Sequence, residues 1–179
     1  MPQAVDRIKT LKLIEAQARR FATPWVEVES RNRNPYRTLI SCILSLRTKD
    51  ETTARASKRL FRLADTPAKM VKLVAQRIQT LIYPVGFYRN KSKSIIDISR
   101  TIIREYKGRV PDELELLLSL KGVGRKTANL VLSQGFNKPA VCVDTHVQRI
   151  SNRLGWVDTV SPEETEKKLK DIFPKSQWG

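Results

Sequence analysis

The chain has 179 residues and a formal net charge of +16, from 34 lysines and arginines against 18 aspartates and glutamates. Its length suits one domain or one unit of two lobes, and its 40% of apolar residues is ordinary for a globular protein. No apolar run approaches the roughly 18 residues of a membrane-spanning helix, and the N-terminus resembles no secretory signal, so we expect an intracellular location.

The positive charge is concentrated in residues 51–110 and indicates a polyanionic partner. Phosphates neutralised by lysine and arginine release condensed counterions, which makes nucleic acid the natural candidate. A basic protein without a special partner is the plain alternative. An anionic membrane is less favoured, because no strongly amphipathic helix gathers the basic residues. The two cysteines, Cys42 and Cys142, lie in separate apolar runs and His146 is the only histidine, so we expect reduced thiols and no metal site.

Hydrophobic periodicity predicts an all-α chain of about nine or ten helices joined by short connections, with no strand. The predicted helices span residues 11–20, 36–46, 50–63, 66–79, 90–106, 114–120, 126–133, 144–154 and 162–173. The segment 36–46 has apolar residues on every side, so we expect it to be the buried central helix. In the segment 90–106, isoleucines recur on one face, and we expect Lys91 and Lys93 to face outward.

A glycine-bracketed turn, Gly122-Val123-Gly124, connects two of the predicted helices. Glycine permits a tight turn and exposes successive N–H groups, which together with a helix N-terminus form an anion site of phosphate size. Val123 is expected to point inward. Three cations surround the turn: Lys121, Arg125 and Lys126. An ordinary connection between helices is the alternative, but the surrounding charge favours contacts to the DNA backbone, which read no base sequence.

Lys126 and Asp144 are the two candidate catalysts. A lysine in a first helical turn is usually a solvated cation or a phosphate contact, but a buried one beside a positive helix end can lose its proton and act as a nucleophile. We expect a buried-looking Lys126 whose pKa is lowered by the positive helix end, by Arg125 beside it and by burial under a bound DNA strand. Its amine can then attack C1′ of a deoxyribose, expel the base and leave a Schiff base. Asp144 either caps the helix that follows it or, as an ionised carboxylate, accepts the proton of the amine.

Close similarity to known proteins narrows these alternatives. The segments LISCILSLRTKD, GFYRNKSKSI, LKGVGRKTANLVL and GFNKPAVCVDTHVQRISNR resemble the helix-hairpin-helix (HhH-GPD) DNA glycosylases, and within them the endonuclease III group. The resemblance extends over about residues 10–175. Its most specific part is GVGRKTA followed by VDTH.

The resemblance implies a base excision repair enzyme, a DNA glycosylase and abasic-site lyase that flips a damaged base out of duplex DNA. The implied substrates are oxidised pyrimidines, and the strand is cut by β-elimination. Lys126 matches the Schiff-base nucleophile of the family, and Asp144 matches its catalytic aspartate. The residues expected to contact DNA are Arg47, Phe87, Lys91, Lys121, Gly122, Val123, Gly124, Arg125, Thr127 and His146. A monofunctional mismatch-directed glycosylase and a non-catalytic DNA-binding module remain as alternatives.

The resemblance also implies a two-lobed all-α fold with the active site in the cleft between the lobes. We expect a helical-barrel lobe over residues 28–138, which includes the helix-hairpin-helix at about 114–134, and a second lobe formed by residues 1–27 and 139–179. The implied partner is double-stranded DNA that contains damaged bases or abasic sites. The enzyme is expected to be a monomer and to work in the cytoplasm, at the nucleoid.

Several positions depart from the family pattern. Lys121 stands in place of a proline and adds charge at the DNA face. Arg47 stands in place of a glutamine that fills the gap of the flipped base, which is expected to alter the preference for the opposite base. Phe87 stands in place of a smaller apolar wedge and can also insert between base steps. The four cysteines of a [4Fe–4S] loop are missing, so we expect no cofactor or metal in this chain and interpret the sequence as a fragment rather than a natural form without the cluster.

Overall fold

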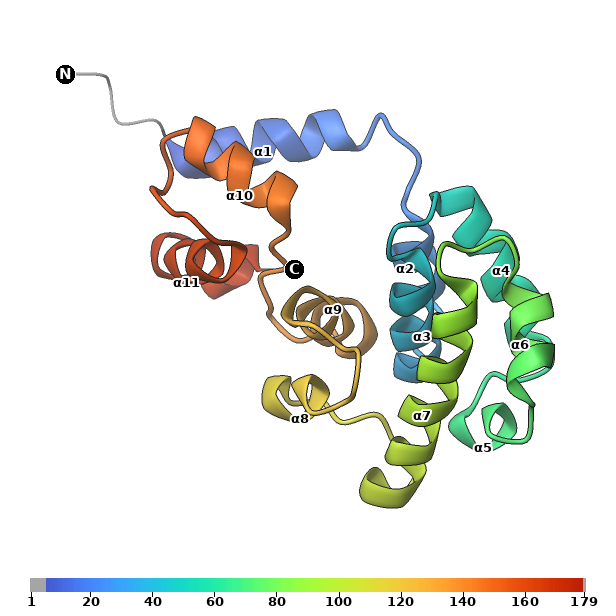
Figure 1. Cartoon of the computed structure of the whole chain (residues 1–179). Coiled ribbons are helices and arrows are strands. Elements are labelled where there is room, and N and C mark those ends of the chain that lie inside the picture. The colour runs from blue at the N-terminus through green and yellow to red at the C-terminus, as the bar shows by residue number, and fades with distance from the viewer. Residues whose placement is uncertain (1–5, 179) are drawn as a thin grey trace. The chain divides into compact units, whose positions relative to one another are not determined.

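The computed structural model describes residues 6–178, and every regular element in this part of the chain is a helix (Figure 1). The predicted all-α class is therefore confirmed. The chain divides into two compact units: one combines the residues up to Pro24 with Val143–Trp178, and the other is the continuous segment Trp25–Cys142. We call them the split unit and the continuous unit. Their role as the two lobes of a glycosylase, with the boundaries expected above, stays a prediction.

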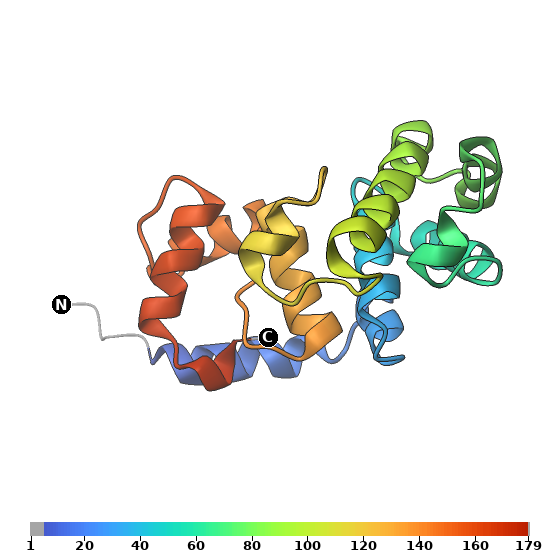
Figure 2. The ribbon, with the colours of Figure 1, turned by 90° about the horizontal axis from the view of Figure 1, so that it is seen from below.

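The continuous unit is built around one helix, α3. Its elements are α2 (Trp25–Ser30), α3 (Pro35–Ser45), α4 (Asp50–Phe61), α5 (Pro67–Met70), α6 (Ala75–Ile82), α7 (Tyr88–Tyr106), α8 (Leu114–Leu118), α9 (Arg125–Leu130) and the π-helical turn η1 (Val131–Gly135). The helix α3 packs against α2, α4, α7, α9 and η1, and α7 runs alongside it in Figures 1 and 2. Leu39, Ile40 and Leu44 of α3 have no exposed surface, which confirms the predicted central helix.

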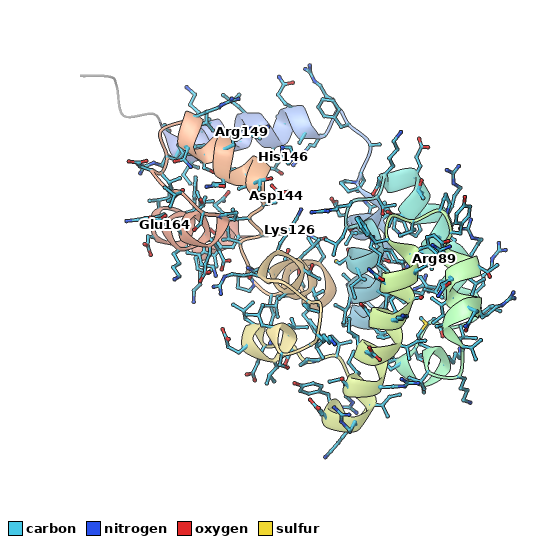
Figure 3. All side chains as sticks on the ribbon, in the orientation of Figure 1. Arg89, Lys126, Asp144, His146, Arg149 and Glu164 are labelled. Carbon is cyan, nitrogen blue, oxygen red and sulfur yellow. The ribbon has the colours of Figure 1, made fainter. Side chains whose placement is uncertain are left out.

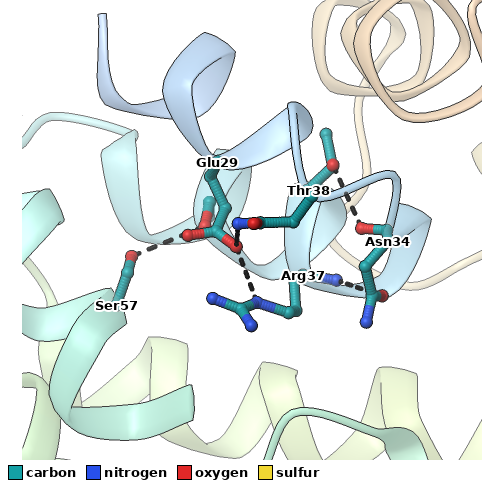
Figure 4. A network of polar contacts seen from close by, with 7 residues as sticks. Glu29, Asn34, Arg37, Thr38 and Ser57 are labelled. Atoms are coloured by element: carbon teal, nitrogen blue, oxygen red, sulfur yellow. Dashed lines mark hydrogen bonds and ion pairs between the residues drawn. The ribbon is translucent and has the colours of Figure 1, made fainter. Parts of the chain in front are cut away.

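A buried ion pair attaches α2 to α3 (Figure 4). The Nε atom of Arg37 lies 2.6 Å from Oε1 of Glu29, a residue that is 1% exposed. The guanidinium of Arg37 also lies 4.8 Å from the ring centre of Phe61 on α4. Asn34 caps α3 by accepting a hydrogen bond from the Arg37 amide at 3.1 Å. Because a buried carboxylate is tolerated only when it is paired, this contact fixes the position of α2, a helix that the sequence pattern did not predict.

The single helix predicted over residues 66–79 is wrong, because the chain forms two helices there. Thr66 caps α5 by accepting a hydrogen bond from the Lys69 amide at 3.3 Å, as its type predicts. The chain then turns, with the Leu73 amide bonded to the Met70 carbonyl at 3.1 Å, before α6 begins at Ala75. Met70 is fully buried at the end of α5, so the bend follows from the packing of this residue in the core.

The split unit is held by a polar network around the connection between two helices. Its elements are α1 (Arg7–Ala18), α10 (Thr145–Arg153), α11 (Pro162–Ile172) and the 3-10 turn η2 (Lys175–Gln177). Asn152 accepts a hydrogen bond from the Thr159 amide at 2.9 Å, and the hydroxyls of Thr159 and Thr165 lie 2.6 Å apart. The rings of Trp156 and Phe173 meet edge to face at 5.2 Å. These contacts fix the end of α10 relative to α11.

Candidate nucleic-acid interface and active site

The hairpin between α8 and α9 has the geometry that its glycines predict. The Val123 amide donates to the Leu120 carbonyl at 2.9 Å, and both side chains are buried, so Val123 points inward as expected. Gly122 has a φ of +89°, in the left-handed region that favours glycine. The hairpin backbone is therefore held from inside by two apolar side chains, while Lys121 remains exposed beside it.

Gly124 shows that the outer side of the hairpin is open. Its backbone is extended, with φ −91°, and a Cβ atom built on it would have no neighbour within 4 Å. Neither the backbone conformation nor crowding inside the chain requires glycine at this position. The first intrahelical bond of α9 runs from the Ala128 amide to the Gly124 carbonyl, so the amides just before Ala128 lie at the positive end of the helix. A phosphate can approach this backbone closely.

The predicted contact residues around the hairpin divide into two kinds. Lys121 and Lys126 are exposed and Arg125 is half-buried, so their side chains can reach a phosphate. Val123 and Thr127 are 6% and 4% exposed, so their contribution to DNA binding is limited to main-chain groups. Backbone amides and flexible cations both contact phosphate without reading bases, which is the type of contact predicted here.

Lys126 lies in the first turn of α9, and its side chain is exposed (Figure 3). The expectation that the chain itself buries Lys126 is wrong. Its carbonyl accepts a hydrogen bond from the thiol of Cys142 at 3.5 Å, which connects α9 to the last residue of the continuous unit. The burial of Lys126 under a bound DNA strand stays a prediction.

Asp144 is the N-cap of α10, as one of the two interpretations predicted (Figure 3). Its Oδ1 atom accepts hydrogen bonds from the amides of His146 and Val147, at 2.9 and 3.0 Å. These bonds fix the carboxylate at the positive end of the helix. His146 is exposed, and its Nδ1 atom lies 3.2 Å from the guanidinium of Arg149. Capping and catalysis are compatible roles for Asp144, because a cap also orients the carboxylate.

Arg47 and Phe87 lie side by side. Each was predicted separately as a DNA contact, but their pairing was not predicted. Both side chains are exposed, and the guanidinium of Arg47 lies 5.7 Å from the ring centre of Phe87. Both residues have a left-handed backbone, with φ of 50° and 57°. Non-glycine residues adopt this conformation uncommonly, and such strain is concentrated at functional sites. We call these two residues the probing pair.

The expectation that Lys91 faces outward and contacts DNA is wrong. Its side chain is 7% exposed, and its amine donates hydrogen bonds to the Leu44 carbonyl at 2.9 Å and to Oγ1 of Thr48 at 3.3 Å. It also donates to the Leu46 carbonyl. Burial lowers the pKa of Lys91 from 10.5 to about 8. The reason for the error is that the carbonyls at the end of α3 attract a cation from the neighbouring helix, which a pattern along one helix does not reveal.

No group of three or more potential metal ligands occurs within residues 6–178. The whole chain has two cysteines, and burial strongly raises the pKa of the Cys42 thiol. A [4Fe–4S] cluster takes four thiolates, so the residues of this chain do not fit one. None of the helices in the described part is both long and apolar enough to span a membrane.

Comparison with known proteins gives matches over most of the chain. Residues 40–175 match the HhH-GPD superfamily of base excision DNA repair proteins. Over 146 residues the chain is 56% identical to endonuclease III of Thermotoga maritima, covering 82% of this chain and 68% of that protein. Two solved structures match with a TM-score of 0.77 and 40% identity, over 81% of this chain and 68% of theirs. They are a non-covalent endonuclease III–DNA complex and a trapped covalent endonuclease III–DNA intermediate with an estranged adenine.

Proposed function

We propose that this chain removes oxidised pyrimidines from duplex DNA through a Schiff base on Lys126. The chain belongs to the HhH-GPD superfamily and is a base excision repair DNA glycosylase of the endonuclease III type with abasic-site lyase activity. The observation that carries the proposal is the place of this amine. The Lys126 side chain is exposed, and it lies in the first turn of the helix that follows a hairpin whose backbone is open at Gly124.

The hairpin supplies the grip on the strand that the reaction needs. The amides at the start of α9 and the cations Lys121 and Arg125 bind the phosphates next to the lesion, independently of sequence. Binding of the strand next to Lys126 displaces water from the exposed amine.

The proposed reaction proceeds in three steps. The neutral amine of Lys126 attacks C1′, a bond forms between Nζ and C1′, and the glycosidic bond breaks as its electron pair leaves with the base, which takes up a proton. Asp144 accepts the proton that the attacking nitrogen loses, and opening of the sugar ring gives the Schiff base. Removal of a proton from C2′ then expels the 3′ phosphate, which cuts the strand by β-elimination.

The probing pair serves to replace the flipped base in this proposal. Arg47 fills the gap and donates hydrogen bonds to the base left without a partner, while Phe87 inserts between base steps. The structure of the trapped endonuclease III–DNA covalent intermediate, to which this chain is similar, is an estranged-adenine complex. We also propose that the protein acts as a monomer on lesions and abasic sites of chromosomal DNA in the cytoplasm.

Borohydride trapping tests the proposal. The wild-type chain, incubated with a duplex that contains thymine glycol and then reduced, should give a covalent protein–DNA band and an incised strand. Lys126→Ala should give neither, whereas the control Lys93→Ala, which removes an exposed lysine from α7, should give both. An equal band with Lys126→Ala would refute the assigned nucleophile. Base release without a trapped band would indicate a monofunctional glycosylase, and salt-sensitive binding without base release would indicate a non-catalytic DNA-binding module.

A further inference from the structure

Lys91 is a buried cation whose side-chain acceptors lie at the end of α3 and in the connection that leaves it. Its three N–H groups are directed to the carbonyls of Leu44 and Leu46 and to the hydroxyl of Thr48. An ammonium has three donors, so the set of acceptors matches it in number. A buried cation is retained only where its partners compensate for the lost water, and here these partners are backbone and hydroxyl oxygens rather than a carboxylate.

These acceptors lie on both sides of Arg47. The Leu46 carbonyl precedes the left-handed Arg47, and the Thr48 hydroxyl follows it. A left-handed conformation of a non-glycine residue persists only when the surrounding structure holds it. The ammonium of Lys91 binds before and after Arg47 at once, and the Thr48 hydroxyl adds a direct hydrogen bond to the Leu46 carbonyl at 3.2 Å, so the two groups together are placed to do this.

The same lysine is attached to the second member of the probing pair. Its amide donates to the Phe87 carbonyl at 3.0 Å, in the first turn of α7. The Gly86 amide donates to the Thr48 hydroxyl at 3.1 Å, so that this hydroxyl joins the two loops. A Cβ atom on Gly86 would lie 2.5 Å from the Arg47 carbonyl, which shows how closely the loops meet.

We propose that Lys91 is a positioning residue for the probing pair: its ammonium fixes the two loops so that Arg47 and Phe87 enter the duplex together at a lesion. This inference rests on the function proposed above. Lys91 acts from inside the protein and does not touch DNA. The competing explanation is a purely structural bond at the end of α3, which would lower stability without changing how the folded protein distinguishes damaged from intact DNA.

The preference for an abasic site separates these explanations. Fluorescence anisotropy gives Kd for two duplexes that differ only in a tetrahydrofuran abasic-site analogue. The Kd ratio is defined as Kd for the intact duplex divided by Kd for the abasic duplex. Lys91→Met keeps the length of the side chain and removes its donors, so this ratio should fall about tenfold, which is the loss of one well-placed contact. Lys93→Met, the matched control, removes an exposed charge two residues away and should leave the ratio unchanged. An unchanged ratio in folded Lys91→Met would overturn the proposal.

A double-mutant cycle tests whether Lys91 acts through the pair. Lys91→Met is introduced into a protein that already carries Arg47→Ala and Phe87→Ala. Without the side chains to be positioned, the loss of Lys91 should no longer change the Kd ratio, because coupled residues are not additive. Additive effects would show that Lys91 influences lesion recognition by another route and would refute the positioning role.

A second pair of variants covers the case in which Lys91→Met does not fold, as judged by circular dichroism. Thr48→Val removes the hydroxyl that joins the loops, and Gly86→Ala forces the Arg47 carbonyl to move, while both retain Lys91. Each variant should have a lower Kd ratio than the wild type. A Kd ratio equal to that of the wild type in both variants would refute the proposal. A wild-type chain with no preference for the abasic duplex would instead refute the proposed function.

Discussion

The buried ammonium of Lys91 should make the stability of the protein depend on pH in the alkaline range. Burial lowers its pKa from 10.5 to about 8, so between these values the unfolded chain keeps a proton that the folded chain has lost. Stability rises with pH wherever the unfolded state binds more protons, by at most about 1.4 kcal/mol per pH unit for one group. The cost of the buried charge is thus fully present below pH 8 and is relieved as the pH rises toward 10.5.

The measurement is urea unfolding followed by circular dichroism at several pH values between 7 and 10, for the wild type and for Lys91→Met. Titration of other groups is common to both proteins and cancels in the difference of their unfolding free energies. That difference should shift in favour of the wild type by about 2–3 kcal/mol across the range, as an upper limit. The Lys93→Met control should show no such shift. A difference that is flat with pH, or that moves in favour of the variant, would refute the reasoning.

Three further predictions concern the hairpin, the cap and the core. Gly124→Ala should keep Tm nearly unchanged, because its Cβ meets open space, yet weaken binding to duplex DNA in anisotropy; equal binding would show that no phosphate approaches this backbone. Asp144→Asn should retain the cap and Tm but lose base excision, whereas Asp144→Ala should also lose about 1 kcal/mol of stability; full excision by the asparagine variant would limit Asp144 to capping. Glu29→Ala should lower the unfolding free energy by about 1.5–3 kcal/mol, because it removes the contact between a buried carboxylate and the partly exposed guanidinium of Arg37; a loss below about 1 kcal/mol in urea titrations would contradict that pairing.

Local chemistry made much of the fold and of the hairpin predictable from sequence. Asn34, Asp144 and Ser161 each cap a helix through a bond to an amide two or three residues later, and such bonds depend only on neighbours in the chain. The turn at Gly122 follows in the same way from a conformation that glycine favours. The candidate catalysts required more than local chemistry, because Lys126 and Asp144 have ordinary structural explanations and were identified through their similarity to known enzymes.

The features that local patterns did not reveal depend on residues far apart in sequence. Lys91 lies at a position of α7 that was expected to face water, and it is buried because the end of α3 presents oxygens to it. The pairing of Arg47 with Phe87 likewise requires the two loops to meet, which the sequence does not state. Sequence alone thus determined the helical class, the cap at Asp144 and the glycine hairpin, since these are set within a few residues. Tertiary structure decided which cations are buried and which are exposed, because burial depends on the elements that pack around each side chain.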